Sequence, residues 1–167
     1  DSNPYATAWN LSASGGAGGL ALGEIVGGTP DEPVVADRQG QLTIYDAITR
    51  QPIRSVPAPA DSRGAWYPHI GDFDGNSVAD IGWASGNGSS APDALVLTEG
   101  ATGATLAQWL TDPGPFWTTA AFEPTLGAAP VRIIAGEIEP GSGPGSILRR
   151  VDADLRLQFT TQLSNFS

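Results

Sequence analysis

Residues 71–83 read GDFDGNSVADIGW and join a polar loop to the start of an apolar segment. Within this loop, oxygen-bearing side chains stand at positions 1, 3, 5 and 9, as Asp72, Asp74, Asn76 and Asp80. Every second side chain of a tight loop points to the same side, so this alternation gathers oxygen atoms around one point. The apolar residues that follow are typical of a β-strand. The stretch therefore predicts a loop of candidate metal ligands that leads directly into a strand.

Calcium is the ion that this set of ligands suits best. It takes about six to eight oxygen atoms from carboxylates, amide and backbone carbonyls, and water. The four side chains and the backbone carbonyl of Val78 supply most of such a shell, and Gly75 supplies the positive φ that a loop needs to wrap around a small sphere. One alternative stays open, which is an Asx-rich turn whose side chains accept hydrogen bonds from the loop's own amides.

The chain also repeats itself with a period of about 50 residues, the range of propeller repeats. An acidic residue opens the polar loop of each unit, at separations of 48 and 51 residues, in Glu24, Asp72 and Glu123. A turn after the third strand candidate recurs at separations of 53 residues, in Asp46, Glu99 and Asp152. Two independent landmarks therefore indicate three copies of one unit.

Each unit is predicted to contain four β-strands and no helix. Short β-rich runs bounded by Gly, Pro, Asp and Ser recur, and no window of about a dozen residues carries a helical apolar period free of Gly or Pro. The second strands are continuously apolar at 34–36 and 133–135, which predicts burial on both faces of the sheet. A four-stranded repeat of this length is typical of a β-propeller blade. The sequence predicts an all-β, propeller-like fold of three four-stranded antiparallel blades, at residues 16–60, 64–112 and 115–163.

Three blades do not complete a ring, because propellers typically have about four to eight. The chain is therefore expected to be part of a larger propeller or a partial ring. Residues 1–15 contain YATAWNLS, which is similar to ATLAQWL at 104–110, and they are a candidate closing strand. An open arc would expose blade faces and strand edges, so we expect a protein partner or self-association that closes the propeller. A compact β-sandwich is the alternative fold.

The stretch GDFDGNSVADI resembles the FG-GAP/VCBS repeat of integrin-type β-propellers. The signature of that family is an apolar residue, Gly-Asp, an apolar residue, and then Asp-Gly-Asp-Gly-x-x-Asp-apolar. The resemblance implies calcium bound by the side chains of Asp72, Asp74, Asn76 and Asp80 and by the backbone of Val78. The chain departs from the signature at Asn76, where a charge is lost, and at Ser77, where the usual glycine is missing. We expect the first departure to weaken calcium binding and the second to strain the turn.

The other two units lack most of these ligands. The first unit keeps Glu24 and Glu32 at the spacing of the acidic residues that begin and end the second loop, but Val26 and Gly28 occupy the positions between them. The third unit carries an apolar residue, Val131, at the far end of its loop. Only the loop of the second unit is therefore predicted to bind calcium.

The composition excludes several classes of function. The chain has 18 acidic residues and eight arginines, and its formal net charge of −10 repels phosphate backbones and anionic lipid headgroups. We therefore expect no nucleic-acid partner, and no membrane insertion because no apolar run approaches about 20 residues. The absence of cysteine excludes disulfides and thiolate metal sites.

Two features favour a secreted or cell-surface location. The chain starts at Asp1 and contains no methionine, which suggests a processed product. The acceptor pattern N-x-S/T occurs at Asn10, Asn87 and Asn165, and N-glycosylation there would place these residues on extracellular loops. Coincidence is the other interpretation of these patterns, because serine and threonine are common in this chain.

Catalysis is not expected from this sequence. His69 is the only histidine, which excludes any two-histidine metal site. A catalytic triad would have to use His69, yet the chain contains no G-x-S-x-G nucleophile elbow. Neither of the glycine-rich nucleotide-binding motifs occurs either. His69 is therefore predicted to be an ordinary residue of a strand or of the rim.

Tryptophan is frequent, and two of the five occupy equivalent positions in the repeat. Trp66 and Trp117 stand in linkers just before the first strand of a unit, where an aromatic ring either stacks on a sugar or wedges between blades. Trp83 lies in an apolar strand and is predicted to be in the core. Sugar stacking leads to the first alternative function, a lectin-like, glycan-binding propeller.

The sequence as a whole predicts a secreted or cell-surface calcium-binding module for interaction, adhesion or assembly. Besides the lectin-like alternative, the chain could be an accessory domain of a polysaccharide-active enzyme, with a cleft that gathers His69 with arginines and carboxylates of several blades. The basic residues available for such a cleft are concentrated in one segment, as Arg149, Arg150 and Arg156. The alternative, non-functional interpretation of that cluster is a solvent-exposed strand face.

Overall fold

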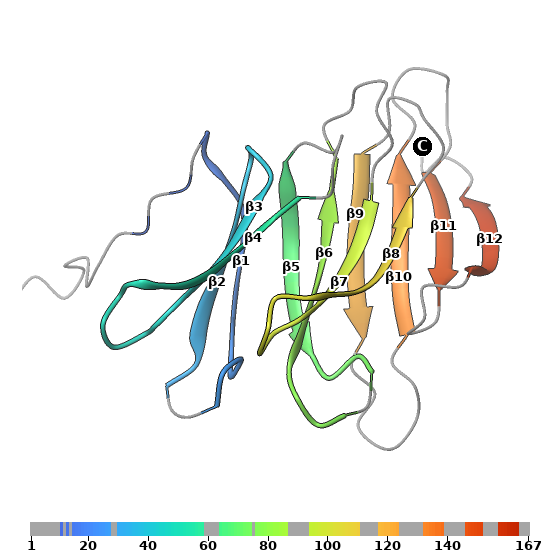
Figure 1. The fold of residues 1–167 in the computed structure, drawn as a ribbon. Helices are drawn as coiled ribbons and strands as arrows, with labels where there is room; N and C mark the ends of the chain where they lie inside the picture. The colour runs from blue at the N-terminus through green and yellow to red at the C-terminus, as the bar shows by residue number, and fades with distance from the viewer. Residues whose placement is uncertain are drawn as a thin grey trace, which may run out of the picture.

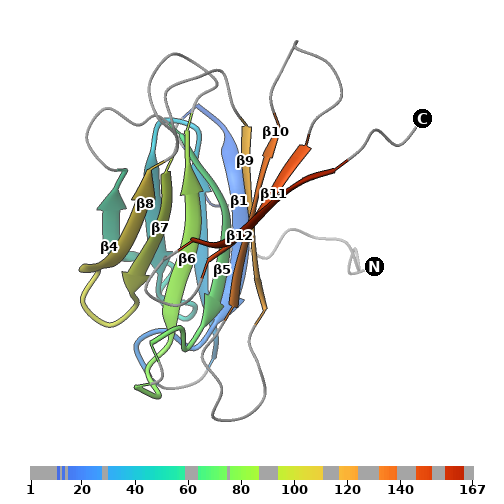
Figure 2. The same cartoon turned by 90° about the vertical axis from the view of Figure 1, so that its right-hand side faces the viewer.

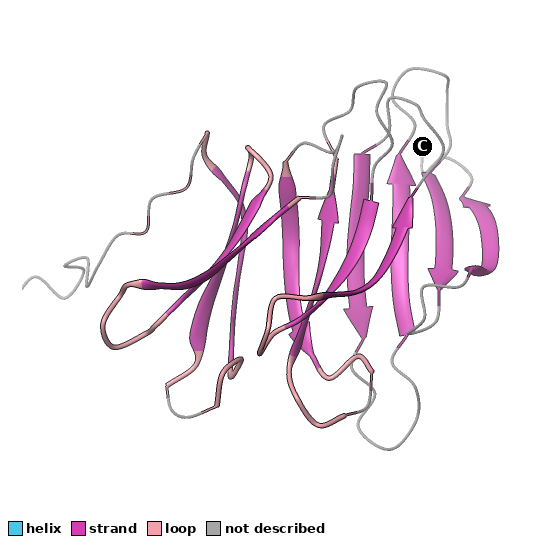
Figure 3. Cartoon of the chain, viewed as in Figure 1, coloured by secondary structure: helices cyan, strands magenta, loops and turns pink. Residues whose placement is uncertain are grey.

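The computed structural model describes side chains in the N-terminal two thirds of the chain and four strand backbones beyond them (Figure 1). The described residues are 11, 13, 15–27, 30–58, 64–74, 76–86 and 94–110, and the backbone at 117–123, 132–138, 146–151 and 157–163. All regular elements among these residues are β-strands (Figure 3). The predicted all-β class is therefore confirmed, and the described part contains no helix long and apolar enough to cross a membrane.

The strands form three four-stranded antiparallel sheets, one in each predicted repeat unit. Sheet 1 contains β1 (Ala17–Gly23), β2 (Glu32–Asp37), β3 (Gln41–Tyr45) and β4 (Pro52–Pro57). Sheet 2 contains β5 (Ala65–Gly71), β6 (Asp80–Ser85), β7 (Ala94–Glu99) and β8 (Thr105–Leu110). Sheet 3 contains β9 (Trp117–Glu123), β10 (Arg132–Ile138), β11 (Ser146–Val151) and β12 (Leu157–Leu163). Within every sheet the strands lie in sequence order, so each unit is a meander of hairpins.

The sheets stack in chain order through their first strands (Figure 1 and Figure 2). Strand β1 contacts β5 and β5 contacts β9, and neighbouring strands of each sheet complete the packing. Glycine allows the close approach of the first pair. A Cβ on Gly19 would lie 2.7 Å from Cδ of Pro68, and a Cβ on Gly23 would lie 2.9 Å from Cγ2 of Ile70. Small residues in β1 therefore let β5 lie directly against it.

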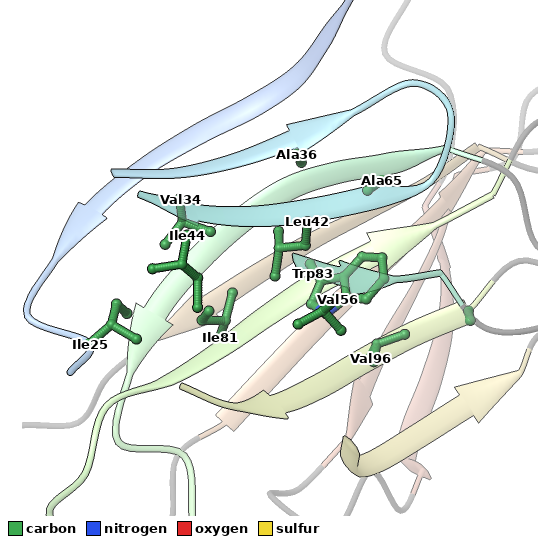
Figure 4. Close-up of a cluster of buried hydrophobic side chains, with 11 residues drawn as sticks. Ile25, Val34, Ala36, Leu42, Ile44, Val56, Ala65, Ile81, Trp83 and Val96 are labelled. Atoms are coloured by element: carbon green, nitrogen blue, oxygen red, sulfur yellow. The ribbon is translucent and has the colours of Figure 1, made fainter. Parts of the chain in front are cut away.

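The hydrophobic core that the structure describes lies between sheets 1 and 2 (Figure 4). The second strands of sheets 1 and 2, β2 and β6, are buried along their whole length. This confirms the prediction for residues 34–36, whereas the side chains of residues 133–135 are outside the described residues. Sheet 1 contributes Val34, Leu42, Ile44 and Val56, and sheet 2 contributes Ile81, Trp83 and Val96. Trp83 is fully buried, in agreement with its prediction as a core residue, and its indole N–H donates a hydrogen bond to Thr98 Oγ1 at 3.0 Å.

The repeat extends to the turns between the third and fourth strands. In sheet 1 the Arg50 amide donates to the Asp46 carbonyl at 2.8 Å, and in sheet 2 the Gly103 amide donates to the Glu99 carbonyl at 2.7 Å. Arg50 and Gly103 both adopt positive φ, at 64° and 78°. The same turn geometry thus recurs at the landmark positions that reveal the repeat in the sequence.

Several predictions concern residues outside the described part of the chain. These include the candidate glycosylation sites Asn10, Asn87 and Asn165, the residues Gly28, Gly75 and Val131, and almost all of the candidate closing strand at 1–15. Arg149 and Arg150 lie in β11, of which only the backbone is described, and Arg156 is outside the described residues.

Candidate metal centre

The predicted calcium loop connects β5 to β6 at one end of sheet 2, and the equivalent loop of sheet 1 lies at the same end of the molecule (Figure 1). Gly71, the last residue of β5, pairs with Asp80, the first residue of β6, at the base of the loop. The antiparallel pairing thereby brings the acidic residue at the end of the loop back to the residues at its start.

Three carboxylates converge in this loop. Asp72, Asp74 and Asp80 each place one carboxylate oxygen so that the three oxygens lie within 4.8 Å of one another. Two oxygens on opposite sides of a calcium ion, with bonds of about 2.4 Å, are about 4.8 Å apart. The three carboxylates are therefore close enough to share one calcium ion.

Asp80 is the one buried member of the cluster. Its side chain is fully buried, and one oxygen, Oδ2, accepts a hydrogen bond from the Phe73 amide at 2.9 Å. The other oxygen, Oδ1, is buried and has no hydrogen-bond partner in the described part of the chain. Leaving a buried acceptor unpaired costs about 1–3 kcal/mol. A cation at this position would remove that cost.

Electrostatics point the same way. Burial raises the pKa of Asp80 to about 6, and the negative charges of Asp74 and Asp72 add to the increase, whereas hydrogen bonding from the Phe73 and Asp74 amides opposes it. The loop therefore disfavours the ionised form of Asp80 as long as no positive charge is nearby. The negative charges of Asp72 and Asp74, which contribute to this increase, also attract a cation.

The remaining loop contacts are Asx-type bonds to the loop backbone. Asp72 Oδ2 accepts from the Ser77 amide at 2.8 Å, and Asp74 Oδ1 accepts from the Asn76 amide at 3.0 Å. The Asn76 side chain donates to Asp74 Oδ2 at 3.0 Å and accepts from the half-buried Val78 amide at 2.6 Å. The alternative of a self-satisfied polar turn thus describes part of this loop, and the buried Asp80 Oδ1 is what it leaves unexplained.

Sheet 1 reveals a structural role that the sequence analysis missed. The Ile25 amide donates to Glu32 Oε2 at 2.7 Å, which is the repeat equivalent of the bond from Phe73 to Asp80. Ile25 and Phe73 are both buried. The carboxylate at the start of the second strand therefore closes the loop in both sheets, with or without a metal. The signal in the sequence is an apolar residue seven positions before an acidic one in the first two units.

Ser77 adopts a positive φ of 68°, in the left-handed region that favours glycine. A side chain in the left-handed region costs about 1–2 kcal/mol. We expect Ser77→Gly to raise the free energy of unfolding by about 0.5–1 kcal/mol in urea titrations, because glycine relieves the strain but loses more entropy on folding. Ser77→Ala retains the Cβ and should give no gain. A Ser77→Gly variant that is less stable than the wild type would contradict this account.

A cavity of about 560 Å³ lies beside the cluster, between the equivalent loops of sheets 1 and 2. Residues 24–27 form one wall, and residues 77–79 with Asp72 and Ala101 form the other. Glu24 and Asp72, the acidic residues that open the two loops, both line it. The cavity therefore carries two carboxylates in a largely apolar lining and shares Asp72 with the candidate metal centre.

Trp66 and Trp117 do not lie in the linkers where the sequence analysis placed them. Trp66 is within β5 and Trp117 is the first residue of β9, so the prediction that both stand in linkers is wrong. The Trp66 indole N–H donates to the Gly86 carbonyl at 2.8 Å, and the Arg38 guanidinium carbon lies 5.6 Å from the centre of its ring. This arrangement favours a wedge over a platform for sugars. The side chain of Trp117 is outside the described residues.

His69 lies in β5, opposite Gly82 of β6, and is half-buried. It is not among the residues of the carboxylate cluster. Its place in a strand agrees with the ordinary role predicted for it.

Comparisons with known proteins add no family to this description. A scan against protein-family models finds no match, and a search of curated proteins finds none either. The resemblance of residues 71–81 to the FG-GAP/VCBS repeat therefore rests on the motif alone and stays a prediction.

Proposed function

We propose that this chain is a calcium-binding module for interaction, adhesion or assembly, built from FG-GAP/VCBS-type propeller blades and acting without catalysis outside the cytoplasm. The observation that carries the proposal is the buried, unpartnered Oδ1 of Asp80 among the carboxylates of Asp72 and Asp74. The stacking of three four-stranded sheets in chain order supports consecutive blades over a two-sheet sandwich.

Calcium fits this cluster better than other common metals. The cluster consists of carboxylates alone, which are the hard oxygen ligands that calcium and magnesium prefer, and the chain has no cysteine and a single histidine for a softer metal. Magnesium demands near-ideal octahedral geometry and retains several waters, whereas calcium accepts irregular cages of protein oxygens. Asn76 and the Val78 carbonyl, which the family motif implies as further ligands, are oxygen donors as well.

The proposed role of the ion is structural. The loop is tied to the rest of the molecule through Gly100, whose amide donates to the Ala79 carbonyl at 3.1 Å. The Gly100 carbonyl in turn accepts from Arg54 Nη1 of sheet 1 at 2.6 Å. A calcium ion that fixes the loop would therefore also stabilise the packing of sheet 1 on sheet 2. Such a scaffold suits a protein that presents rigid surfaces to a partner.

The decisive experiment is urea unfolding in 10 mM calcium chloride and in chelator. Extracellular modules bind calcium with dissociation constants of about 0.1–1 mM. At that affinity, 10 mM calcium raises the free energy of unfolding by about 1.4–2.7 kcal/mol. Magnesium chloride at the same concentration controls for ionic strength and should give a much smaller effect. An equal effect of the two ions, or no effect of calcium, would contradict the proposal.

A matched variant distinguishes calcium binding at the cluster from a general effect of the chain's negative charge. Asp31 is an exposed carboxylate of the equivalent loop in sheet 1 and is not part of the cluster. Asp31→Asn removes the same charge as a substitution inside the cluster, and it should retain the full calcium response.

Glycan binding, by a lectin-like propeller or an accessory domain of a polysaccharide-active enzyme, is the second candidate function. The observation that favours it is Tyr67, which is 47% exposed at a positive φ of 49° beside Trp66. Strained backbone conformations cluster at functional sites, and an exposed aromatic ring offers an apolar face and a polar hydroxyl to a ligand such as a sugar. Quenching of tryptophan fluorescence by saccharides, and its loss in Tyr67→Ala, would support this second function.

A further inference from the structure

The cavity between the loops of sheets 1 and 2 has the size and the lining of a binding pocket. Its volume is about 560 Å³, and pockets for small ligands measure about 300–1,000 Å³, with mainly apolar walls and a few polar groups. Apolar side chains from both sheets line it, namely Ile25, Val26, Val78, Ala79 and Ala101. Asp72 is the residue that the cavity shares with the carboxylate cluster. The cavity is therefore a candidate binding site beside the metal centre.

The two walls of the cavity meet at Gly100. The Gly100 amide donates to the Ala79 carbonyl at 3.1 Å, and a Cβ at this position would lie 2.7 Å from Cγ2 of Ile25. At Gly27, by contrast, a Cβ would have no described neighbour within 4 Å, and Val26 beside it is 42% exposed. The cavity thus has a packed base and an open mouth, so a side chain of another molecule can enter it without a rearrangement of the sheets.

Both walls carry negative charge. Glu24 lies on the wall from sheet 1 and Asp72 on the wall from sheet 2, and the described lining contains no arginine or histidine. An ionised carboxylate has about four lone-pair positions, so the hydrogen bond that Asp72 Oδ2 accepts from the Ser77 amide leaves capacity for a further donor. Two carboxylates among apolar walls favour a ligand that is cationic at one end and apolar along its length.

Arginine is the side chain that combines these properties best. Its guanidinium is planar and weakly hydrated, and it presents five N–H donors that can bond more than one carboxylate oxygen. Its methylene groups can bury against apolar surface while the charged head remains at the carboxylates. The lysine ammonium is a more strongly hydrated point charge, so it loses more on entering an apolar cavity. The net charge of −10 also attracts basic partners over a longer range.

We propose that this cavity binds an arginine side chain of a partner protein, with the guanidinium between Glu24 and Asp72 and the methylene groups against Val26 and Val78. The inference deepens the proposed interaction function, on which it rests for its biological role, by naming the chemistry of the partner. Glu24 lies outside the carboxylate cluster. The arginine site and the calcium site therefore have separate key residues and can be tested separately.

Nuclear magnetic resonance titration of the isotope-labelled protein with the blocked peptide acetyl-Val-Arg-Val-amide, in chelator, tests the proposal. We expect saturable shifts of the amides of Gly27, Ala79 and Ala101. The dissociation constant should be on the order of 1 mM, because one side chain makes few contacts and a partly exposed ion pair contributes little. The same peptide with citrulline, the neutral analogue of arginine, should bind at least about tenfold more weakly, because hydrogen bonds between ionised groups are lost.

Two pairs of variants locate the peptide in the cavity. Glu24→Gln should weaken binding about fivefold, the upper range for an exposed ion pair, whereas Asp31→Asn removes the same charge from the same loop outside the lining and should bind nearly as tightly as the wild type. Ala101→Arg places a guanidinium of the chain itself in the cavity and should abolish the shifts. Ala104→Arg adds the same charge at an exposed position outside the lining and should retain them.

Three results would overturn the proposal: no saturable shifts up to about 10 mM peptide, which is tenfold above the expected dissociation constant, equal binding of the arginine and citrulline peptides, or unchanged binding in both Glu24→Gln and Ala101→Arg. Urea unfolding of Glu24→Gln in calcium and in chelator tests the calcium proposal separately. The carboxylate cluster is intact in this variant, so its calcium response should be retained. The failure of one proposal is thus distinguishable from the failure of the other.

Discussion

We expect Asp80→Asn to stabilise the calcium-free protein at pH 7 by about 1–3 kcal/mol and to abolish its response to calcium. The physical reason is that the wild type keeps a buried carboxylate whose pKa is raised to about 6, with an oxygen that has no partner in the described residues. One pKa unit corresponds to about 1.4 kcal/mol. The asparagine carbonyl still accepts the Phe73 amide, and its N–H groups can donate to the carboxylates nearby. The neutral side chain removes the penalty and also removes a ligand.

Urea titration in chelator and in calcium measures both effects. Asp80→Ala is the matched control, since it also removes the ligand but leaves the buried Phe73 amide without its acceptor. That variant should be unresponsive to calcium and less stable than Asp80→Asn. An Asp80→Asn protein that is destabilised in chelator, or that retains the calcium response, would show that the loop is not a calcium site of this kind.

The same substitution has a defined pH dependence. The folded-state pKa of Asp80 is raised from 3.8 to about 6, so the folded protein retains a proton that the unfolded chain has already released between these values. The contribution of Asp80 to stability is therefore fully present below pH 4 and is lost as the pH rises through about 6. In chelator, the stability of Asp80→Asn and of the wild type should be similar near pH 4 and should separate toward pH 7. A constant difference would exclude titration of Asp80 as the cause.

Trp83→Ala has the largest expected effect on stability, a loss of about 3–5 kcal/mol. Trp83 is fully buried and belongs to the cluster in which side chains of sheet 1 meet those of sheet 2 (Figure 4). Its removal opens a cavity at the centre of that interface. Since the free energy of unfolding of a native protein is only about 5–15 kcal/mol, the variant should lose a large part of it. Urea unfolding measures the loss, and near-ultraviolet circular dichroism reports the loosened packing.

Trp83→Phe separates ring volume from the hydrogen bond. It keeps most of the apolar contact but removes the indole N–H that donates to the buried Thr98 hydroxyl. We expect a loss of about 1–2 kcal/mol, from one buried hydrogen bond and a smaller ring. A loss below about 1 kcal/mol in both variants would show that Trp83 is not packed between the two sheets.

The repeat accounts for most of what could be predicted about the fold. The landmarks at Asp46 and Glu99 mark turns of the same geometry, because the sequence of a tight turn specifies its own hydrogen bonds over a few residues. The continuous apolar run at residues 34–36 predicted a buried strand, and β2 is buried along its whole length. Such features depend on neighbours in sequence, and a single chain contains them in full.

The candidate site was predictable in its members but not in its chemistry. The spacing of Asp72, Asp74 and Asp80 indicated a shared ligand cage, and the structure brings their carboxylates together. Which oxygen of Asp80 accepts the Phe73 amide, and which one remains buried without a partner, depends on how β5 and β6 close the base of the loop. The placement of Trp66 was wrong because its strand begins one residue before it, and element boundaries depend on pairing with the next strand.

The amino-acid sequence by itself determined the strands, their order within each sheet, and the carboxylates that gather in one loop, because these follow from local periodicity, turn residues and spacing. Tertiary structure alone decided the burial of Asp80, the matching bond from Ile25 to Glu32, and the exposure of Leu20 and Leu22. Burial is a property of pairs of segments about 50 residues apart that meet across sheets. Equivalent residues such as Leu22 and Ile70 therefore differ in exposure, since only the second lies beneath a described sheet.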